Sequence, residues 1–312
     1  MIMLDLYSIG EMVIDFIPGT EPGSYVRNAG GAPANVAIAM ARNGLKAGMC
    51  CSVGEDDFGR FLIKTLEENR VRCIKPGLCG KAITTMAFVS LAGNGERTFT
   101  FARKPGADMF LLEEDVKEED IRESCIVHAG SCSLSASPAS EATVRAVKLG
   151  HEMKKIVSFD VNYRNLMWKD DQEACAKAVL DLLPYVDILK ISEEEVDMIG
   201  GEERLFELME RCSLSLIVET LGSAGAKCYF DGRILTVEGR KARAVDATGA
   251  GDAFWGGFLS SLRIQGVERT EQLTAEIIES ALRYGNTAGW ICVQHKGAIS
   301  SLPTREEIEK NL

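Results

Sequence analysis

The segment Ala244–Phe254 combines glycines, a predicted helix start and a carboxylate, a grouping suited to phosphate chemistry. Val245 ends an apolar, strand-like run, and the apolar residues after the segment recur at helical spacing. Gly249 and Gly251 carry no side chain that would block a ligand, and the first free N–H groups of the helix would point at it. A phosphate suits such a site, and the Asp252 carboxylate beside it is costly unless it acts as a base. The spacing predicts phosphoryl transfer to a hydroxyl, with a purely structural turn as the alternative.

Polar positions in the first 35 residues could meet a ligand, although each also has an ordinary structural explanation. Gly30 and Gly31 permit a hinge or a close approach to a sugar, and a tight turn would use them equally well. The Asn35 amide could pair with hydroxyl groups or lie on a helix face. Asp15 interrupts an apolar run, so a polyhydroxylated ligand or a backbone cap must satisfy its carboxylate.

Further candidates lie in the middle of the chain. The turn Thr220–Gly225 follows a strand and could bind nucleotide phosphates through its amides, or be a plain left-handed turn. The cluster Glu193–Glu195 starts a predicted helix, where the helix dipole alone would account for it, or one member could orient Mg²⁺ through water. Lys190 and Arg164 are candidate phosphate partners or solvated surface charges, and Arg103 is a weaker candidate.

Composition excludes several classes of protein. The 312 residues carry a net charge of −11, which argues against nucleic acid or an anionic membrane as the main partner. No apolar run approaches the roughly 20 residues of a membrane helix, and residues 1–7 lack the features of a signal peptide. The ten cysteines form no CxxC pair and the three histidines are far apart, so a zinc site is not expected. We expect a soluble cytoplasmic protein with reduced thiols.

The elements that must position these residues alternate between strand and helix. Strands are predicted at Leu4–Ile9, Tyr25–Val26, Ala47–Val53, Ala82–Leu91, Arg97–Arg103, Cys125–Ala129, Ile156–Phe159, Val186–Ile191, Leu214–Thr220, Ala226–Phe230, Ile234–Val237 and Ala242–Val245, and residues 12–17 are an apolar run interrupted by Asp15. Helices are predicted at Pro33–Asn43, Phe58–Asn69, Pro138–Gly150, Gln172–Leu183, Glu193–Ile199, Glu202–Arg211, Gly249–Arg263, Glu271–Gly289 and Arg305–Lys310.

This alternation predicts an α/β fold with a doubly wound, mostly parallel sheet and helices on both faces. The early strands and a hairpin around Gly93–Gly95 do not fit it. We expect them to form a small separate sheet, a lid, inserted at about residues 11–29 and 82–107 of a single catalytic domain spanning 1–312. Neither a P-loop nor a GxGxxG dinucleotide motif occurs.

Two motifs occur in one chain at a specific spacing. The first runs from Gly30-Gly31-Ala-Pro-Ala-Asn35 to Gly54-Glu-Asp-Asp-Phe-Gly59, and the second is Asp246–Asp252. Together they resemble the ribokinase-type (PfkB) carbohydrate kinase family over nearly the whole chain, except that Ala247 stands where the family usually has Thr, Pro, Ser or Val. The resemblance implies a ribokinase-like three-layer αβα Rossmann-like domain with a β-sheet lid. Such lids often pair, so a homodimer is expected.

The resemblance also implies roles for individual residues. Asp252 matches the general base, and the anion hole matches Gly249, Ala250 and Gly251. Glu195 matches the residue that organises Mg²⁺, although Ser192 replaces the Asn of that Asn-x-x-Glu motif. The monovalent-cation ligands, with K⁺ as the candidate ion, correspond to Asp246 and Thr248. Thr220, Gly222 and Gly225 match the nucleotide loop and Asn286 lies where the family has an Asn beside the nucleotide; Lys190 joins them as a candidate phosphate partner from the sequence alone. The candidate sugar-binding residues, chosen from the sequence, are Asp15, Gly30, Gly31, Asn35, Arg103 and Arg164.

Four segments resemble the fructokinase branch: Glu11–Phe16, Gly95–Phe99, Pro105–Asp108 and Phe159–Arg164. The sequence therefore predicts ATP-dependent phosphorylation of the primary 6-hydroxyl of D-fructose to fructose 6-phosphate. Aminoimidazole riboside kinases share most of these features, so that activity, or another PfkB sugar or nucleoside kinase, is the alternative. A catalytically silent sugar- or nucleotide-binding regulator is a remote alternative, and a Rossmann-type dehydrogenase is a third.

Overall fold

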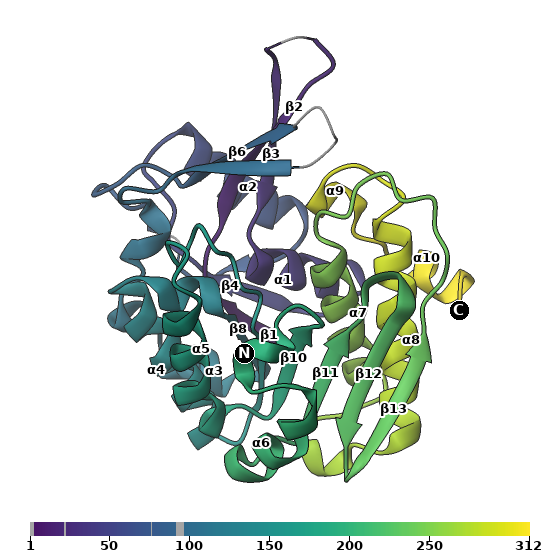
Figure 1. The fold of residues 1–312 in the computed structure, drawn as a ribbon. Helices are drawn as coiled ribbons and strands as arrows, with labels where there is room; N and C mark the ends of the chain where they lie inside the picture. Colours follow the sequence, from purple (N-terminus) through teal and green to yellow (C-terminus); the bar gives the residue numbers. More distant parts are fainter. Residues whose placement is uncertain (1–2, 22, 76, 92–96) are drawn as a thin grey trace.

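A computed structural model of the chain describes residues 3–21, 23–75, 77–91 and 97–312. Across these residues a nine-stranded sheet has the strand order β13-β12-β11-β10-β9-β8-β1-β4-β5 (Figure 1). Its strands from β11 to β5 are parallel, and β12 and β13 add an antiparallel edge. The strands are β1 (Leu4–Ile9), β4 (Ala47–Cys50), β5 (Arg72–Cys73), β8 (Ser124–Gly130), β9 (Ile156–Asp160), β10 (Ile188–Ser192), β11 (Leu216–Thr220), β12 (Gly225–Phe230) and β13 (Arg233–Glu238).

Helices cover both faces of this sheet because successive strand residues point to opposite sides. Ile126 and Ile188 face one apolar core, whereas their neighbours Val127 and Leu189 face the other. The first core includes α1 (Ala32–Arg42), α2 (Asp57–Glu68), α7 (Ala250–Ile264) and α8 (Ala275–Cys292). The second includes α3 (Glu118–Arg122), α4 (Ala139–Glu152), α5 (Gln172–Leu182) and α6 (Leu205–Cys212). The short helices α9 (Ala298–Ser301) and α10 (Arg305–Lys310) follow α8.

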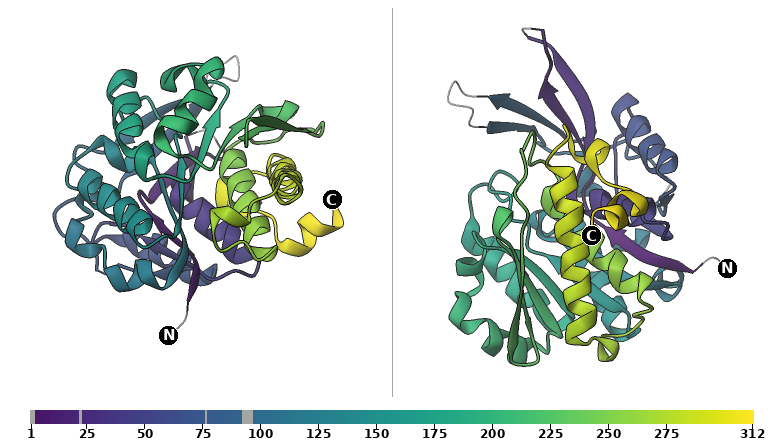
Figure 2. Two further views of the ribbon diagram at one scale, coloured as in Figure 1. Left: turned by 90° about the horizontal axis from the view of Figure 1, so that it is seen from below. Right: turned by 90° about the vertical axis from the view of Figure 1, so that its right-hand side faces the viewer.

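A smaller sheet projects from one end of the main body (Figures 1 and 2). It has the order β3-β2-β6-β7, formed by β2 (Val13–Pro18), β3 (Tyr25–Gly30), β6 (Met86–Leu91) and β7 (Arg97–Ala102). The β2–β6 pairing is parallel and joins segments about seventy residues apart, so the early strands and the later hairpin form one unit. The predicted turn at Gly93–Gly95 lies outside the described residues.

Two predictions of local structure were wrong. Residues 242–245 do not form a strand, because Val245 is 50% exposed and its amide donates to the Val293 carbonyl (2.7 Å) at the end of α8. The cluster Glu193–Glu195 forms a turn after β10 rather than a helix start, and a single 3₁₀ turn, Val196–Ile199, follows it. In the part of the chain that the structure describes, no helix combines the length and apolarity needed to cross a bilayer.

Candidate active site

Polar residues gather where the parallel strands end. Glu11 follows β1, Asp160 ends β9, Lys190 lies in β10 shortly before Glu195, and Thr220 ends β11. Because the carboxyl ends of parallel strands share one edge of the sheet, these side chains converge there, as ligand-binding residues do in open α/β folds.

A cavity of about 1000 Å³ opens at this edge and reaches the smaller sheet and the start of α7. Every residue predicted for the site lines this cavity except Gly30, Arg103 and Asp246. The cavity is large enough for a nucleotide and a small polar substrate together.

The start of α7 has the geometry that the sequence predicts. Gly249 caps the helix with φ of +79°, and a Cβ there would lie 2.9 Å from that of Ala298. The Ala250 amide closes the preceding turn by donating to the Ala247 carbonyl (3.2 Å). Asp252 lies in the first helical turn and is 8% exposed. The helix therefore presents its N-terminus and a buried carboxyl group to the cavity.

Asp252 is held by a residue from a distant element. The Asn35 amide on α1 donates from Nδ2 to Asp252 Oδ2 at 2.7 Å. Burial raises the pKa of Asp252 to about 6, and the nearby Asp160 carboxylate raises it too, whereas the Asn35 hydrogen bond and the charges of Arg164 and Lys190 oppose the rise. The carboxylate form therefore predominates at neutral pH, which suits a general base.

A buried ion pair lies beside this carboxyl group. Lys190 Nζ donates to both oxygens of Asp160 (2.9 and 2.8 Å), and the two residues face each other on β10 and β9. Although burial alone would lower the pKa of Lys190, the Asp160 carboxylate raises it, so the ammonium remains charged. A Cβ on Gly251 would lie 3.7 Å from Nζ, which places this cation at the start of α7.

Glu195 joins two strand ends. Its Oε1 accepts from the Tyr163 amide (2.7 Å) and its Oε2 from the Ser192 amide (2.9 Å). Burial and the Asp160 charge raise the pKa of Glu195. In the described ranges no group of three or more His, Cys, Asp or Glu side chains is arranged to hold a metal ion. An ion here would therefore need ligands from phosphate and water besides Glu195.

At the smaller sheet, two glycines make room for a carboxyl group and a sharp turn. A Cβ on Gly30 would lie 2.2 Å from Asp15 Oδ2, so Gly30 leaves the space that the Asp15 carboxylate occupies. Gly31 has φ of +114°, and a Cβ there would lie 2.5 Å from the Glu11 carbonyl oxygen. Burial raises the pKa of Asp15 to about 6, opposed by the charge of Arg164.

The two predicted arginines lie in different surroundings. Arg103 pairs with Asp108 (2.8 Å), donates to Ser135 Oγ (3.1 Å) and to the carbonyl of the lining residue Met167 (3.5 Å), and does not itself line the cavity. Arg164 is exposed, lines the cavity and donates to the Tyr163 carbonyl (3.0 Å). Arg164 is thus the arginine that a ligand in the cavity can reach.

The predicted nucleotide residues gather around β11 to β13. Thr220 Oγ1 donates to the Ile191 carbonyl (3.3 Å), and Gly222 has φ of +54° with open space around its Cα. A Cβ on Gly225 would lie 2.1 Å from the Val237 carbonyl oxygen, which also accepts from Asn286 Nδ2 (3.1 Å). These contacts fix the loop and α8 against β13.

Asp246 braces the loop before α7. Its Oδ1 accepts from the Thr248 amide (2.8 Å) and its Oδ2 from the Gly297 amide (3.0 Å). The carboxylate is buried but does not line the cavity, whereas Thr248 does.

A buried chain of side chains fastens α7 to the sheet. Trp255 Nε1 donates to Ser158 Oγ (3.0 Å), and Ser158 Oγ lies 3.0 Å from His128 Nδ1. Burial lowers the pKa of His128 to about 4, so the imidazole is neutral, and its Nδ1 and the Ser158 hydroxyl share a hydrogen bond. The helix that carries Asp252 is therefore anchored one turn beyond that residue.

Sequence reasoning did not select Glu11 and Asp160 for the site. Glu11 lines the cavity and is 4% exposed, and a carboxylate after a buried strand is the signal that identified Asp15. Asp160 could be found only from strand register, because its partner Lys190 is 30 residues away.

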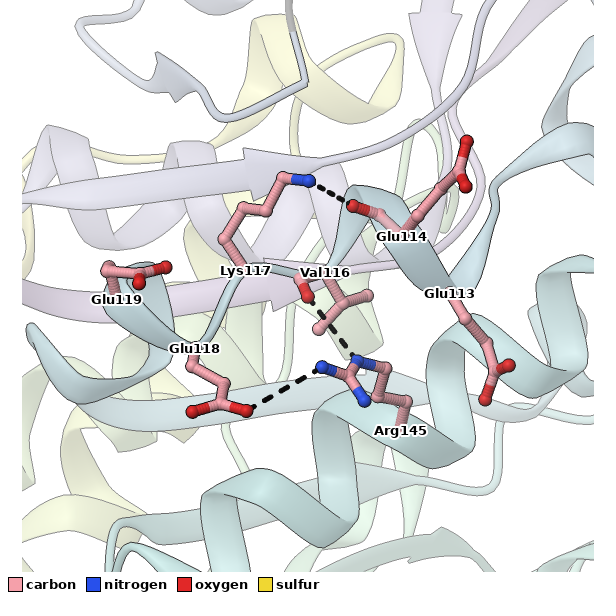
Figure 3. A pocket seen from close by; sticks show the side chains of 7 residues that line it. All are labelled: Glu113, Glu114, Val116, Lys117, Glu118, Glu119 and Arg145. Atoms are coloured by element: carbon pink, nitrogen blue, oxygen red, sulfur yellow. Dashed lines mark hydrogen bonds and ion pairs between the residues drawn. The ribbon is translucent and has the colours of Figure 1, made fainter.

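A second cavity, of about 550 Å³, lies between α3, α4 and the turn before α3 (Figure 3). Lys117 donates to the Glu114 carbonyl there, and Arg145 donates to the Val116 carbonyl (3.4 Å) and pairs with Glu118 (3.8 Å). It contains none of the residues predicted for the site.

Comparison with known proteins gives concordant matches. The model of a family described as "pfkB family carbohydrate kinase" matches residues 3–305. Fructokinase-1 of Oryza sativa subsp. japonica is 37% identical over 313 residues, which cover 97% of this chain and 96% of that protein.

Solved structures of similar fold include enzymes with bound ligands. Fructokinase from Vibrio cholerae O395 in its form with fructose, ADP and calcium ion has a TM-score of 0.87 and 32% identity, covering 99% of this chain and 98% of that one. A double mutant of that enzyme in a form with fructose, ADP and potassium ion has a TM-score of 0.87 and 31% identity, with the same coverage. Aminoimidazole riboside kinase from Salmonella enterica, complexed with aminoimidazole riboside and an ATP analog, has a TM-score of 0.84 and 26% identity, covering 98% of each chain.

Proposed function

Since the chain belongs to the pfkB family of carbohydrate kinases, we propose that it transfers the γ-phosphoryl group of ATP to the 6-hydroxyl of D-fructose, giving fructose 6-phosphate. The expected ribokinase-like three-layer α/β fold with a small separate sheet is confirmed by the structure and its similarity to solved kinases. The observation that carries the proposal is the buried Asp252, held by Asn35 at the N-terminus of α7 in a cavity large enough for two substrates.

Asp252 is the proposed general base. Its raised pKa, about 6, leaves it mostly ionised at neutral pH, so it can accept the hydroxyl proton as the oxygen attacks. The amides of Gly249, Ala250 and Gly251 would stabilise charge on the transferred group. Because the Ala250 amide already donates to the Ala247 carbonyl, we assign the larger part of this charge stabilisation to the amides of Gly249 and Gly251. Phosphoryl transfer depends chiefly on such positioning and electrostatics.

The sugar is proposed to bind between the smaller sheet and Asp252. Asp15, Asn35 and Arg164 line this part of the cavity, Gly31 shapes the turn beside it, and Gly30 keeps Asp15 in place. Since Arg103 is paired with Asp108 outside the lining, we assign it to positioning the chain around Asp108 rather than to direct sugar contact.

The nucleotide is proposed to bind along β10 to β13. Lys190 would meet its phosphates, Thr220, Gly222 and Gly225 would form the phosphate loop, and Asn286 would lie beside the nucleoside. ATP carries its phosphates with Mg²⁺, which neutralises their charge when bound. Glu195 fits this role because its carboxylate is fixed by two amides and retains lone pairs for metal-bound water.

Asp246 and Thr248 are proposed to hold K⁺ beside the loop. The motivation is a buried carboxylate next to the phosphate site, together with the potassium-ion form of the related Vibrio enzyme. A monovalent ion there would add positive charge near the start of α7.

We also propose that the smaller sheet is a lid over the sugar, that the chain is a single catalytic domain, and that two copies pair through the lid. The sheet carries an aromatic cluster in which Phe16 stacks on Phe88 (4.9 Å) and Tyr25 meets Phe88 edge-on (5.9 Å). Tyr25 and Val26 remain 47% and 54% exposed, which supports a partner at this surface. The ten free cysteines support a reducing cytoplasmic location.

A coupled ADP-release assay with a substrate panel tests this function. The panel is D-fructose, D-ribose, 2-keto-3-deoxygluconate, adenosine and aminoimidazole riboside, and we expect the highest kcat/KM with D-fructose. The Salmonella similarity makes aminoimidazole riboside the second candidate, and a higher value for it would replace fructose as the substrate. No turnover of any acceptor would indicate a silent binding protein.

A further inference from the structure

Glu11 is a carboxylate in the main cavity to which the proposed reaction gives no role. It lies where the chain crosses from β1 to β2, is 4% exposed and lines the cavity. Its Oε1 accepts from the Ala32 amide at the start of α1 (3.3 Å). Its Oε2 is buried and has no hydrogen-bond partner among the described residues.

Burying a carboxylate oxygen without a hydrogen-bond donor costs free energy, and native structures rarely contain such an oxygen. Burial raises the pKa of Glu11 to about 7 and the Asp108 charge adds to the rise, whereas hydrogen bonds from the backbone of Glu11 and Ala32 and the charge of Arg103 oppose it. Arg103 donates to Asp108, Ser135 and the Met167 carbonyl, and its Nη2 forms an ion pair with Asp108 (2.8 Å) but no hydrogen bond within the described residues. No hydrogen bond joins this arginine to Glu11 Oε2.

A second acceptor in the same cavity is also buried without a hydrogen-bond donor among the described residues. Asn35 Oδ1 is buried and has no hydrogen-bond partner in the described part of the chain, while its Nδ2 holds Asp252. Asn35 lies three residues after Ala32, on the same side of α1. Two unsatisfied acceptors thus line one cavity beside the first turn of α1, Glu11 through its bond to Ala32 and Asn35 as part of the helix, and a polyol has the hydroxyl donors to satisfy both.

We propose that Glu11 determines sugar specificity by accepting, through Oε2, a hydrogen bond from a sugar hydroxyl other than the one that is phosphorylated. The charges that act most on Asp252 are Asp160, Arg164 and Lys190, whereas those that act most on Glu11 are Asp108 and Arg103, so the two carboxyl groups have different charged surroundings. Anchoring Ala32 needs one oxygen, and the second is free for the ligand. The inference rests on the proposed binding of a sugar in this cavity.

Glu11→Gln tests the assignment because glutamine keeps the size and an acceptor for Ala32 but replaces the second oxygen with a donor. We would measure kcat/KM for D-fructose, 1-deoxy-, 3-deoxy- and 4-deoxy-D-fructose and 2,5-anhydro-D-mannitol. In the wild type, kcat/KM for the analogue that lacks the bonded hydroxyl should be about tenfold or more below that for D-fructose. In Glu11→Gln, kcat/KM for fructose should fall by a similar factor. The analogue that lacks the bonded hydroxyl should show little further loss of kcat/KM, and KM for ATP should stay unchanged.

Equal losses for every sugar in Glu11→Gln would overturn the proposal and leave Glu11 as an anchor of Ala32. Thermal unfolding checks the variant's fold, and Glu11→Asp, which draws the carboxylate back, should show the same hydroxyl-specific loss. Glu67→Gln, on the exposed side of α2, is the matched control and should follow the wild type. If wild type does not phosphorylate fructose, the proposed function fails separately, and the same comparison on deoxy analogues of the preferred acceptor decides the role of Glu11.

Discussion

Asn35 Nδ2 donates to Asp252 Oδ2 at 2.7 Å, although 217 positions separate the two residues. The contact joins the starts of α1 and α7 at a single carboxyl group, and α1 is also the helix into which β3 of the smaller sheet leads. The proposed sugar-binding and phosphate-binding parts of the cavity therefore meet at one hydrogen bond.

Asp252→Asn should abolish most turnover without unfolding the protein. Removing a general base typically costs about 10²- to 10⁴-fold in kcat, and asparagine preserves the size of the side chain. A coupled ADP-release assay with fructose measures the loss. Asp231→Asn, in the exposed turn between β12 and β13, is the control and should retain full activity. Near-normal turnover of Asp252→Asn would remove Asp252 from the role of base.

Activity should fall at acid pH as Asp252 becomes protonated. The base works as a carboxylate, and burial raises its pKa to about 6, so kcat/KM should decline as the pH falls through about 6. Asp15, with a pKa of about 6, and Glu11, with one of about 7, contribute to the same limb. A flat profile between pH 5 and pH 8 would contradict the raised pKa values.

The Asn35→Ala variant distinguishes the contribution of Asp252 to the acid limb from those of Asp15 and Glu11. The Asn35 amide stabilises the charged form of Asp252, so its loss should raise the pKa of Asp252 and shift the acid limb to higher pH. The pH profile of kcat/KM for this variant, compared with wild type, measures the shift. A lower kcat/KM with an unmoved limb would mean that Asn35 serves substrate binding alone.

Lys190→Met should destabilise the fold as well as weaken ATP binding. It leaves the Asp160 carboxylate buried without its partner, which typically costs about 3–5 kcal/mol. Adding Asp160→Leu should recover much of the free energy of unfolding but not the KM for ATP. Chemical denaturation measures the free energy of unfolding, and initial rates give KM for ATP. If the double variant recovers both quantities, Lys190 has no contact with the nucleotide.

Gly30→Ala should impair the sugar side selectively. The added Cβ would lie 2.2 Å from Asp15 Oδ2, so the carboxylate must move, and a displacement of about 1 Å can cost up to about 100-fold in rate. We expect kcat/KM for fructose to fall with KM for ATP unchanged. Gly77→Ala, where a Cβ meets no atom within 4 Å, is the control. An unaltered fructose KM and kcat would exclude Asp15 from sugar binding.

Several elements could be predicted from sequence because local pattern and tertiary environment agree. The strand Leu4–Ile9 and the helix Arg305–Lys310 have the predicted bounds. The glycines before Asp252 predicted a turn, and Gly249 has the positive φ that such a turn uses. The Lys190–Asp160 pair depends on strand register, which no local pattern contains. The segment at Val245 failed as a strand because its backbone partner is the end of a helix, not a neighbouring strand.

Trp255, Ser158 and His128 make the catalytic helix a fixed reference within the molecule. Since α7 is tied to the centre of the parallel sheet one turn beyond Asp252, we expect the carboxyl group to keep its position when a sugar binds. If the smaller sheet acts as the proposed lid, its closure would bring the sugar to the proposed base, which is already in position. A compound that wedges the smaller sheet open would thus block transfer while leaving the phosphate-binding machinery intact.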